Sequence, residues 1–490
     1  MLSLGKKILH SPYFFVIAVL YQCIVFVIAR NDPFFGDAIS STAQAAHHIY
    51  NNNLLSVFYP TIKDPGHPTL YPWLLAALWK ILGQHFWVAH AFSCLCALLF
   101  VYAFKKLASI FLSIPTCNVA IIALLCFATY LAQSTMMLNT MILMSFFLLS
   151  VKGVYTGNKW STMVFATLMS ITHLQSMFLL LSLACFHLAN KKEKTILAWG
   201  IKYFWVYAIP FLFFVGWLVV HHHHAGWWLI SPDYSDVNEL NGISTYVKAV
   251  LITIWRLIDY GMIGVYGFLF YFYLKYKHAR PIINQWLFLA LPCILTITIF
   301  LNNTIGHRYF LAFNAFAIIL LLHVTILFTS NKQKTAILLV TLSTLLAGNF
   351  LYYPGKNLGD ATIAYRGYFT AIAQLKNDVE KTIPLYSHAP IANPSFLTNL
   401  QQIQPEINRI NDTDLDALPA IVQSNVNAEF SVAQQRYLRE NWYGKTYGDG
   451  IVYVNLFLNP KFYKKPDNWK LREVSAIEQM MLKLKARAGK

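Results

Sequence analysis

Charged residues are scarce in this chain of 490 residues. Asp, Glu, Lys and Arg make up 12% of the sequence, whereas soluble domains carry about 25% charged residues. At the same time 57% of the residues are hydrophobic, and they gather in blocks of roughly 17–25 residues, the length that crosses about 30 Å of hydrocarbon. This distribution excludes a single soluble globular core and indicates a protein that packs mostly against lipid.

Acidic residues are especially few, since 21 Asp and Glu stand against 38 Lys and Arg, for a formal net charge of +17. Such an excess of cations can indicate nucleic-acid binding. Here, however, the cations form short clusters between apolar blocks, as the positive-inside rule produces, so nucleic acid is not expected as a partner. The clusters are Lys6 and Lys7; Lys105 and Lys106; Lys152 and Lys159; Lys191, Lys192 and Lys194; Lys275, Lys277 and Arg280; and Lys332 and Lys334.

The sequence also lacks cysteine chemistry. Its seven cysteines lie in or beside apolar blocks, and no CxxC motif or Cys/His metal spacing occurs. We therefore expect neither a disulfide framework nor a zinc module. No cofactor is certain, and a divalent metal is possible but not implied. Internal repeats, which many transporters contain, are missing as well.

The apolar blocks predict about 11 transmembrane helices, with the N-terminus in the cytoplasm. The first block runs from Pro12 to Ala29 and is long for a cleaved signal peptide. The other spans are expected at about 85–104, 115–132, 134–151, 200–220, 249–274, 281–301, 308–329 and 335–353, with two short helices within 161–189. This topology puts every lysine cluster inside, and it puts the loop 30–84 with its interfacial helices outside.

The composition becomes polar after Tyr353. Residues 355–490 contain helical stretches near 371–383 and 429–441 and strand-like runs at 383–387, 420–423 and 451–457. The predicted fold class is thus an α-helical polytopic membrane domain, residues 1–353, followed by a small α/β extracytoplasmic domain, residues 355–490. We expect the second domain to cover the site or to select acceptors.

Two segments of the first outer loop could carry chemistry. Asp37 ends the sequence NDPFFGD (31–37) directly after the first helix, where a carboxylate near lipid headgroups suits a general base. Alternatively, Asp37 caps the helix that begins near Ala38. The second segment, KDPGHPTLYPWLLA (63–76), brings Lys63 and His67 to the start of an aromatic interfacial helix.

Other polar groups stand at the outer ends of apolar blocks. His173 and Gln175 interrupt the block 161–189, where a helix break suits contact with a sugar. His221 begins a run of four histidines that either caps a span at the interface or lines a headgroup site. Arg256 and Asp259 lie three residues apart on one helix face, either as a local salt bridge or as a pair that lines a cavity.

Together these segments resemble glycosyltransferase family 39 of the GT-C superfamily, which includes protein O-mannosyltransferases and the aminoarabinose transferases of lipid A. The resemblance covers roughly residues 10–330 and consists of short motifs in a fixed order. The motifs are Asp37 after the first helix, HPTLYPWLLA (67–76) closing with Leu82-Gly83, the paired short helices around His173, Gly216-Trp217 and Gly226-Trp227, and HRYFL (307–311) opening a late span.

The resemblance implies a membrane glycosyltransferase that takes a sugar from a polyprenyl-phosphate carrier. Asp37 matches the family's catalytic acid and would take the proton of the acceptor hydroxyl as it attacks the anomeric carbon. Arg308 matches the family's late arginine and would bind the donor phosphate bidentately. The other expected phosphate contacts are His67, Lys63 and Arg256. The residues expected to contact sugar or acceptor are Asn139, His173, Gln175, Asp259 and His221.

Two positions depart from the family pattern. His67 stands where members often carry a lysine, and a histidine, with a reference pKa near 6.5, supplies a full charge only if the site raises that value. Asn139 stands where many members place a second aspartate. A neutral amide can hydrogen-bond a sugar but cannot act as a base. The second departure therefore argues against a two-acid mechanism and against metal dependence.

Other functions remain open from the sequence. The chain could be a transporter or flippase of lipid-linked sugars, or a family member that binds glycan without catalysis. The acceptor could be a glycan, a lipid or a protein. The lysine clusters, the few cysteines and the missing eukaryotic retention signal indicate a bacterial inner membrane, with the C-terminal domain in the periplasm.

Overall fold

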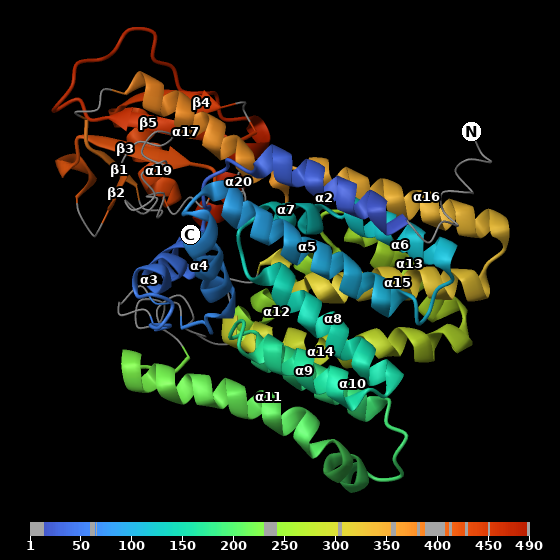
Figure 1. Ribbon diagram of the computed structural model, residues 1–490. Coiled ribbons are helices and arrows are strands. Elements are labelled where there is room, and N and C mark those ends of the chain that lie inside the picture. Colours follow the sequence, from blue (N-terminus) through green and yellow to red (C-terminus); the bar gives the residue numbers. More distant parts are fainter. Residues whose placement is uncertain are drawn as a thin grey trace. The chain divides into compact units, whose positions relative to one another are not determined.

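The computed structural model of the chain describes residues 14–58, 64, 66–229, 243–301, 306–353, 359–379, 383–387, 407–410, 414–426, 430–448 and 451–487. The chain forms two compact units (Figure 1). One consists of Met1–Arg30 and Ser40–Phe350, and the other of Asn31–Ile39 and Leu351–Lys490. The short loop Asn31–Ile39 is thus part of the same unit as the C-terminal end of the chain.

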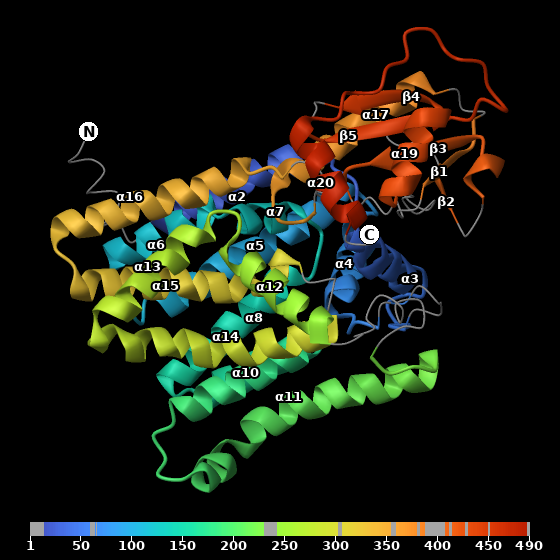
Figure 2. The same cartoon turned by 180° about the vertical axis from the view of Figure 1, so that it is seen from behind.

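The first unit is a bundle of apolar helices (Figures 1 and 2). Among the described residues, four helices are long and apolar enough to cross a membrane, two bent pairs pass the same test together, and four shorter helices are apolar. The predicted polytopic helical architecture is therefore confirmed. The helices are α2 (Phe15–Ala29), α3 (Ala45–Asn51), α4 (Leu70–Leu82), α5 (Phe86–Ala108), α6 (Ile114–Cys126), α7 (Ala128–Thr135), α8 (Thr140–Thr156), α9 (Lys159–Ser170), α10 (Ser176–Ala189), α11 (Ile196–Ala225), α12 (Ile243–Ile258), α13 (Met262–Lys275), α14 (Arg280–Leu301), α15 (Leu311–Phe328) and α16 (Asn331–Ala347).

Helices α8 and α15 form the centre of the bundle. Most side chains of α15, and all those from Thr140 to Val151 in α8, are buried. Helix α11 lies along the outside, beside α9 and α10 (Figures 1 and 2), and about half of its apolar side chains are exposed. Contiguous apolar surface of this kind is typical of a membrane-embedded face.

Two predicted spans are divided by sharp bends. The predicted span 115–132 consists of α6 and α7, which meet at 68°, and the predicted span 249–274 consists of α12 and α13, which meet at 98°. At the second bend Tyr260 and Gly261 have positive φ values of 48° and 91°, a backbone conformation that ends a right-handed helix. A Cβ atom on Gly261 would lie 2.2 Å from the carbonyl oxygen of Thr344 in α16. The bend therefore depends on close backbone packing that only glycine permits.

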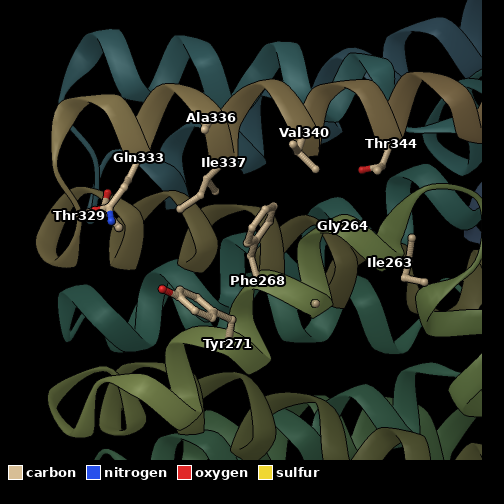
Figure 3. Close-up of a pocket in the computed structure, with 11 residues that line it drawn as sticks. Ile263, Gly264, Phe268, Tyr271, Thr329, Gln333, Ala336, Ile337, Val340 and Thr344 are labelled. Atoms are coloured by element: carbon tan, nitrogen blue, oxygen red, sulfur yellow. The ribbon is translucent and has the colours of Figure 1, made fainter.

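Beyond this close approach, α13 and α16 enclose a pocket of about 490 Å³ (Figure 3). Gly264 and Phe268 of α13 face Ile337 and Val340 of α16, and Gln333 lies near one end. The lining is largely apolar, and the described lining residues include none of those predicted for the functional site. This pocket therefore has the character of a gap between helices that lipid can fill.

The second unit contains a five-stranded mixed sheet in its described part, in the order β2-β1-β3-β5-β4. Strand β1 pairs in parallel with β2 and β3, whereas β5 is antiparallel to both β3 and β4. The predicted small α/β domain is confirmed, although β2 and β4 were not predicted. The elements are α17 (Gly367–Asp378), β1 (Leu385–Ser387), β2 (Ile407–Arg409), β3 (Ala420–Ser424), α19 (Val432–Asn441), β4 (Tyr443–Gly448), β5 (Tyr453–Leu458) and α20 (Ala476–Arg487).

Candidate functional site

The loop before α4 is tied to the C-terminal end of α11. The Asp64 carboxylate accepts a hydrogen bond from Nε2 of His221 at 3.0 Å, and both side chains are buried. The second Asp64 oxygen accepts the backbone N–H of Gly66 at 2.7 Å, and the Trp217 indole N–H donates to the Gly66 carbonyl at 3.4 Å. These bonds fix the backbone immediately before His67.

His67 lies against His173, and their ring centroids are 3.8 Å apart. His173 occupies the turn between α9 and α10, where its Nδ1 accepts the backbone N–H of Gln175 at 3.0 Å. Burial, followed by the electrostatic influence of His67 and Arg308, holds the pKa of His173 well below its ordinary value. His173 is therefore neutral near pH 7, and its Nε2 carries the proton and acts as a hydrogen-bond donor.

Arg308 joins this group from a third part of the chain. It lies in the short helix η6 (His307–Phe310), which leads into α15. The Gln175 side-chain amide donates to the carbonyl of Tyr309 at 3.2 Å, which holds η6 against the turn before α10. The guanidinium of Arg308 is half-buried and lies 5.3 Å from the centroid of the Tyr309 ring. We call His67, His173, Gln175 and Arg308 the histidine–arginine cluster.

A second polar group meets the same short helix. His307 is buried, and its Nε2 donates to the Asp259 carboxylate at 3.2 Å. Its Nδ1 lies 3.3 Å from Nη1 of Arg256, so the arginine donates to a neutral imidazole. Asp259 also accepts the backbone N–H of Tyr260 at 2.8 Å, at the bend between α12 and α13. Arg256 and Asp259 are thus connected through His307, and the prediction of a site around this pair did not include that histidine.

The remaining predicted residues lie in different surroundings. Asn139 is buried directly before α8. Asp37 is exposed and belongs to the second unit, so the structure does not relate it to the histidine–arginine cluster. Lys63 lies outside the described residues. No group of three His, Cys, Asp or Glu side chains that could hold a metal ion occurs among the described residues.

Sequence reasoning missed the parts played by Asp64 and His307. Asp64 and His307 each stand within a few residues of a predicted site residue. The hydrogen-bond partner of Asp64 is 157 residues away along the chain, and that of His307 is 48 residues away. The only signal in the sequence was that Asp64 and His307 are polar residues that each stand beside a predicted phosphate contact. It does not identify a partner, because long-range hydrogen bonds between side chains leave no spacing pattern in the sequence.

Gly66 provides a test of this loop. Its φ is +71°, and an added Cβ would lie 2.5 Å from the Trp227 ring. We expect Gly66→Ala to lower the free energy of unfolding by about 1–2 kcal/mol from backbone strain, with displacement of Trp227 in addition. Thermal unfolding of the purified protein would measure the effect.

The matched control is Gly216→Ala in α11, where an added Cβ has no described atom within 4 Å. Alanine is a better helix former than glycine by about 1 kcal/mol. The unfolding midpoint of the Gly216→Ala variant should therefore equal or exceed that of the wild type. Equal midpoints for Gly66→Ala and the wild type would show that the loop is not held as described.

The site as a whole offers cations and neutral donors together. Arg308 lies in η6, Arg256 contacts His307 of the same short helix, and guanidinium groups suit phosphate oxygens. The Nε2–H of His173 is a neutral donor of the kind that binds a hydroxyl or a phosphate ester oxygen. The arrangement can therefore bind an anionic group next to a polar one.

Two solved structures have a similar fold. ArnT from Cupriavidus metallidurans bound to undecaprenyl phosphate aligns with a TM-score of 0.53 and 10% identity, covering 93% of this chain and 100% of that one. The apo state of the same protein aligns with a TM-score of 0.51 and 12% identity, covering 92% and 98%. ArnT has the GT-C fold, so the predicted GT-C architecture is confirmed.

The sequence comparisons give one family. The model of the EpsG family matches residues 47–366, about two thirds of the chain. The matched range contains the histidine–arginine cluster together with Arg256, Asp259 and His307, and it begins after Asp37. No curated protein matches the chain by sequence.

Proposed function

The chain belongs to the EpsG family, and from this membership and the GT-C fold we propose that it is a membrane glycosyltransferase. It moves a sugar from a polyprenyl-phosphate carrier to an acceptor hydroxyl on the periplasmic face of a bacterial inner membrane. The acceptor is a glycan, a lipid or a protein. Undecaprenyl phosphate is the molecule bound to ArnT, which supports a carrier of the same chemical class here.

The observation that carries the proposal is the meeting of His67, His173, Gln175 and Arg308 from three separate segments. Arg308 and Arg256 bind the donor phosphate, with His67 and Lys63 as further contacts. Within the described part of the chain, the buried Nε of Arg256 has no hydrogen-bond partner. An unsatisfied buried donor costs about 1–3 kcal/mol, and a phosphate oxygen would remove that cost.

An apolar groove supports the lipid part of the donor. It lies between α10 and α11, has a volume of about 940 Å³ and is lined mostly by aromatic and aliphatic side chains. Ser170, Met177 and Phe178, at one part of its lining, flank the turn that carries His173 and Gln175. A carrier with its phosphate at the histidine–arginine cluster would therefore have an apolar path for its isoprenoid chain.

The proposed reaction is a single displacement with inversion. The Asp37 carboxylate takes the proton of the acceptor hydroxyl, whose oxygen forms a bond to the anomeric carbon. The bond between that carbon and the phosphate oxygen breaks, and polyprenyl phosphate leaves with the electron pair. Arg308 and Arg256 stabilise the negative charge that develops on the phosphate. His173, Gln175, Asn139, Asp259 and His221 are assigned to the sugar or the acceptor.

The test is sugar transfer by the purified protein in lipid nanodiscs. Polyprenyl-phosphate hexoses and pentoses with labelled sugars are supplied together with lipid, polysaccharide and protein fractions of a cell envelope. We expect one donor to release free polyprenyl phosphate while its label enters one acceptor fraction. The absence of transfer from the whole donor panel, by protein that still binds polyprenyl phosphate, would contradict the proposal.

The two bent helix pairs favour a second candidate, a flippase of lipid-linked sugars. Broken helices are a common feature of transporter sites, and the pairs α6/α7 and α12/α13 are bent by 68° and 98°. Proteoliposomes with a fluorescent lipid-linked sugar distinguish the two functions. A flippase moves the intact lipid between leaflets, whereas a transferase releases the carrier only when an acceptor is present.

A further inference from the structure

The loop that carries Asp37 is anchored to the C-terminal part of the chain by a charge pair. Asp32 accepts two hydrogen bonds from Arg366, one from Nε and one of 3.1 Å from Nη2. The two side chains are only 16% and 27% exposed. A two-point arginine–carboxylate pair fixes orientation as well as distance. Both residues belong to the second compact unit, although 334 residues separate them in the sequence.

A second anchor lies three residues further along the loop. The Phe35 ring stacks on Tyr365 at 4.7 Å between centroids and also meets Tyr368 at 6.2 Å and Phe369 at 6.1 Å. These distances fall in the favourable range of about 4.5–7 Å for aromatic pairs. The neighbouring Phe34 is 1% exposed. The loop is thus held by the packing of Phe35 against three aromatic rings, in addition to the Asp32–Arg366 ion pair.

The partners of both anchors lie in one short segment of the second unit, residues 365–369. Arg366 and Tyr365 end the short helix η8 (Ile363–Arg366), and Tyr368 and Phe369 lie in the first turn of α17. Helix α17 packs on β4 and β5. At the junction, an added Cβ on Gly367 would lie 3.0 Å from the Val452 side chain. The anchors therefore rest on a helix that is fixed against the sheet.

From this arrangement we infer that the C-terminal domain positions the general base, and that Arg366 and Phe35 are positioning residues for Asp37. The inference rests on the role proposed above for Asp37. Phe35 precedes Asp37 by two residues, a distance of at most about 7 Å along the chain. Between them Gly36 adopts a φ of +54°, and the N–H groups of Ala38 and Ile39 close a turn onto the carbonyls of Phe35 and Gly36 at 3.1 and 3.0 Å. Anchoring Phe35 therefore limits where the Asp37 carboxylate can lie.

The decisive experiment combines kinetics with amide hydrogen exchange of the full chain in nanodiscs. Arg366→Gln removes the two-point pair. We expect faster exchange over residues 31–39 and a kcat for sugar transfer that falls on the order of 10- to 100-fold, because small misplacements of a catalytic group have effects of this size. The KM for the polyprenyl-phosphate donor should change less than about twofold, because Arg366 does not bind the donor phosphate.

Two further variants separate positioning from general damage. The exchanged pair Asp32→Arg with Arg366→Asp should recover part of the lost kcat and of the exchange protection. Arg436→Gln removes an exposed arginine whose partner Glu440 lies in the same helix, and it should behave as the wild type in both measurements. Wild-type exchange over residues 31–39 in Arg366→Gln, or a loss of kcat that the exchanged pair does not recover, would overturn the inference.

The exchange measurement does not depend on the proposed activity. If the wild-type protein transferred no sugar from any donor, the proposed function would fail. Faster exchange over residues 31–39 in Arg366→Gln would still show that the C-terminal domain orders this loop.

Discussion

Replacing Asp37 with asparagine is expected to reduce the kcat for sugar transfer by about 10²–10⁴-fold, the usual contribution of a general base. Asparagine keeps the size and hydrogen-bonding capacity of the side chain but cannot accept the proton of the acceptor hydroxyl. It also caps a helix about as well as aspartate does, so loss of a cap cannot explain the effect. The measurement is the rate of label transfer at saturating donor, together with the affinity for polyprenyl phosphate, which should not change.

The matched control is Asp467→Asn, which removes an exposed carboxylate from the second unit and should leave kcat unchanged. Asp37→Glu keeps a carboxylate at a shifted position and should retain more activity than Asp37→Asn. If Asp37→Asn transferred sugar at the wild-type rate, another group would have to be the base.

Arg308 is expected to give the second largest effect. Hydrogen bonds to charged groups contribute about 1.5–3 kcal/mol, so Arg308→Gln should weaken the binding of polyprenyl phosphate roughly 10- to 150-fold. The loss in kcat/KM should be at least as large, because negative charge grows on the phosphate as the bond to the sugar breaks. Binding by native mass spectrometry and transfer kinetics would measure the two effects separately.

Arg308→Lys refines this test, since lysine keeps the charge and lacks the planar fork. Its affinity should lie between those of the wild type and Arg308→Gln. Lys332→Gln, which removes an exposed cation at the start of α16, should bind the carrier as the wild type does. Undiminished binding by both Arg308 variants would place the carrier phosphate elsewhere.

Much of the helical fold was predictable because lipid imposes a length and an apolar composition on each span. The predicted spans 85–104 and 308–329 agree with α5 and α15 to within a few residues. The bend of 98° between α12 and α13 was not predicted. Hydropathy measures the composition of a segment and contains no information on the direction of its helix axis. Tyr260-Gly261 was the local signal, but a glycine inside an apolar block indicates a bend only when its packing against another helix is known.

Residues of the site could be predicted only at positions where a sequence motif specified the type of residue. His67, His173, Gln175 and Arg308 were each proposed from the sequence, and the structure brings them together. His221 and Asp259 were proposed without their partners, Asp64 and His307. The two residues of the Asp32–Arg366 pair are 334 residues apart, and a single sequence contains no signal of such a pairing.

The separation of 334 residues between Asp32 and Arg366 has a consequence for how the protein is synthesised and folds. Chains are synthesised at about 5–20 residues per second, so Arg366 is added roughly 15–70 s after Asp32. The apolar helices of the first unit can insert and pack during this interval, while the loop that carries Asp37 still lacks its anchors. Full competence for transfer would then arise only after Arg366 and the helix that follows it have been synthesised. A chain cut before residue 366 would occupy the membrane with the Asp37 loop unanchored and would transfer sugar more slowly.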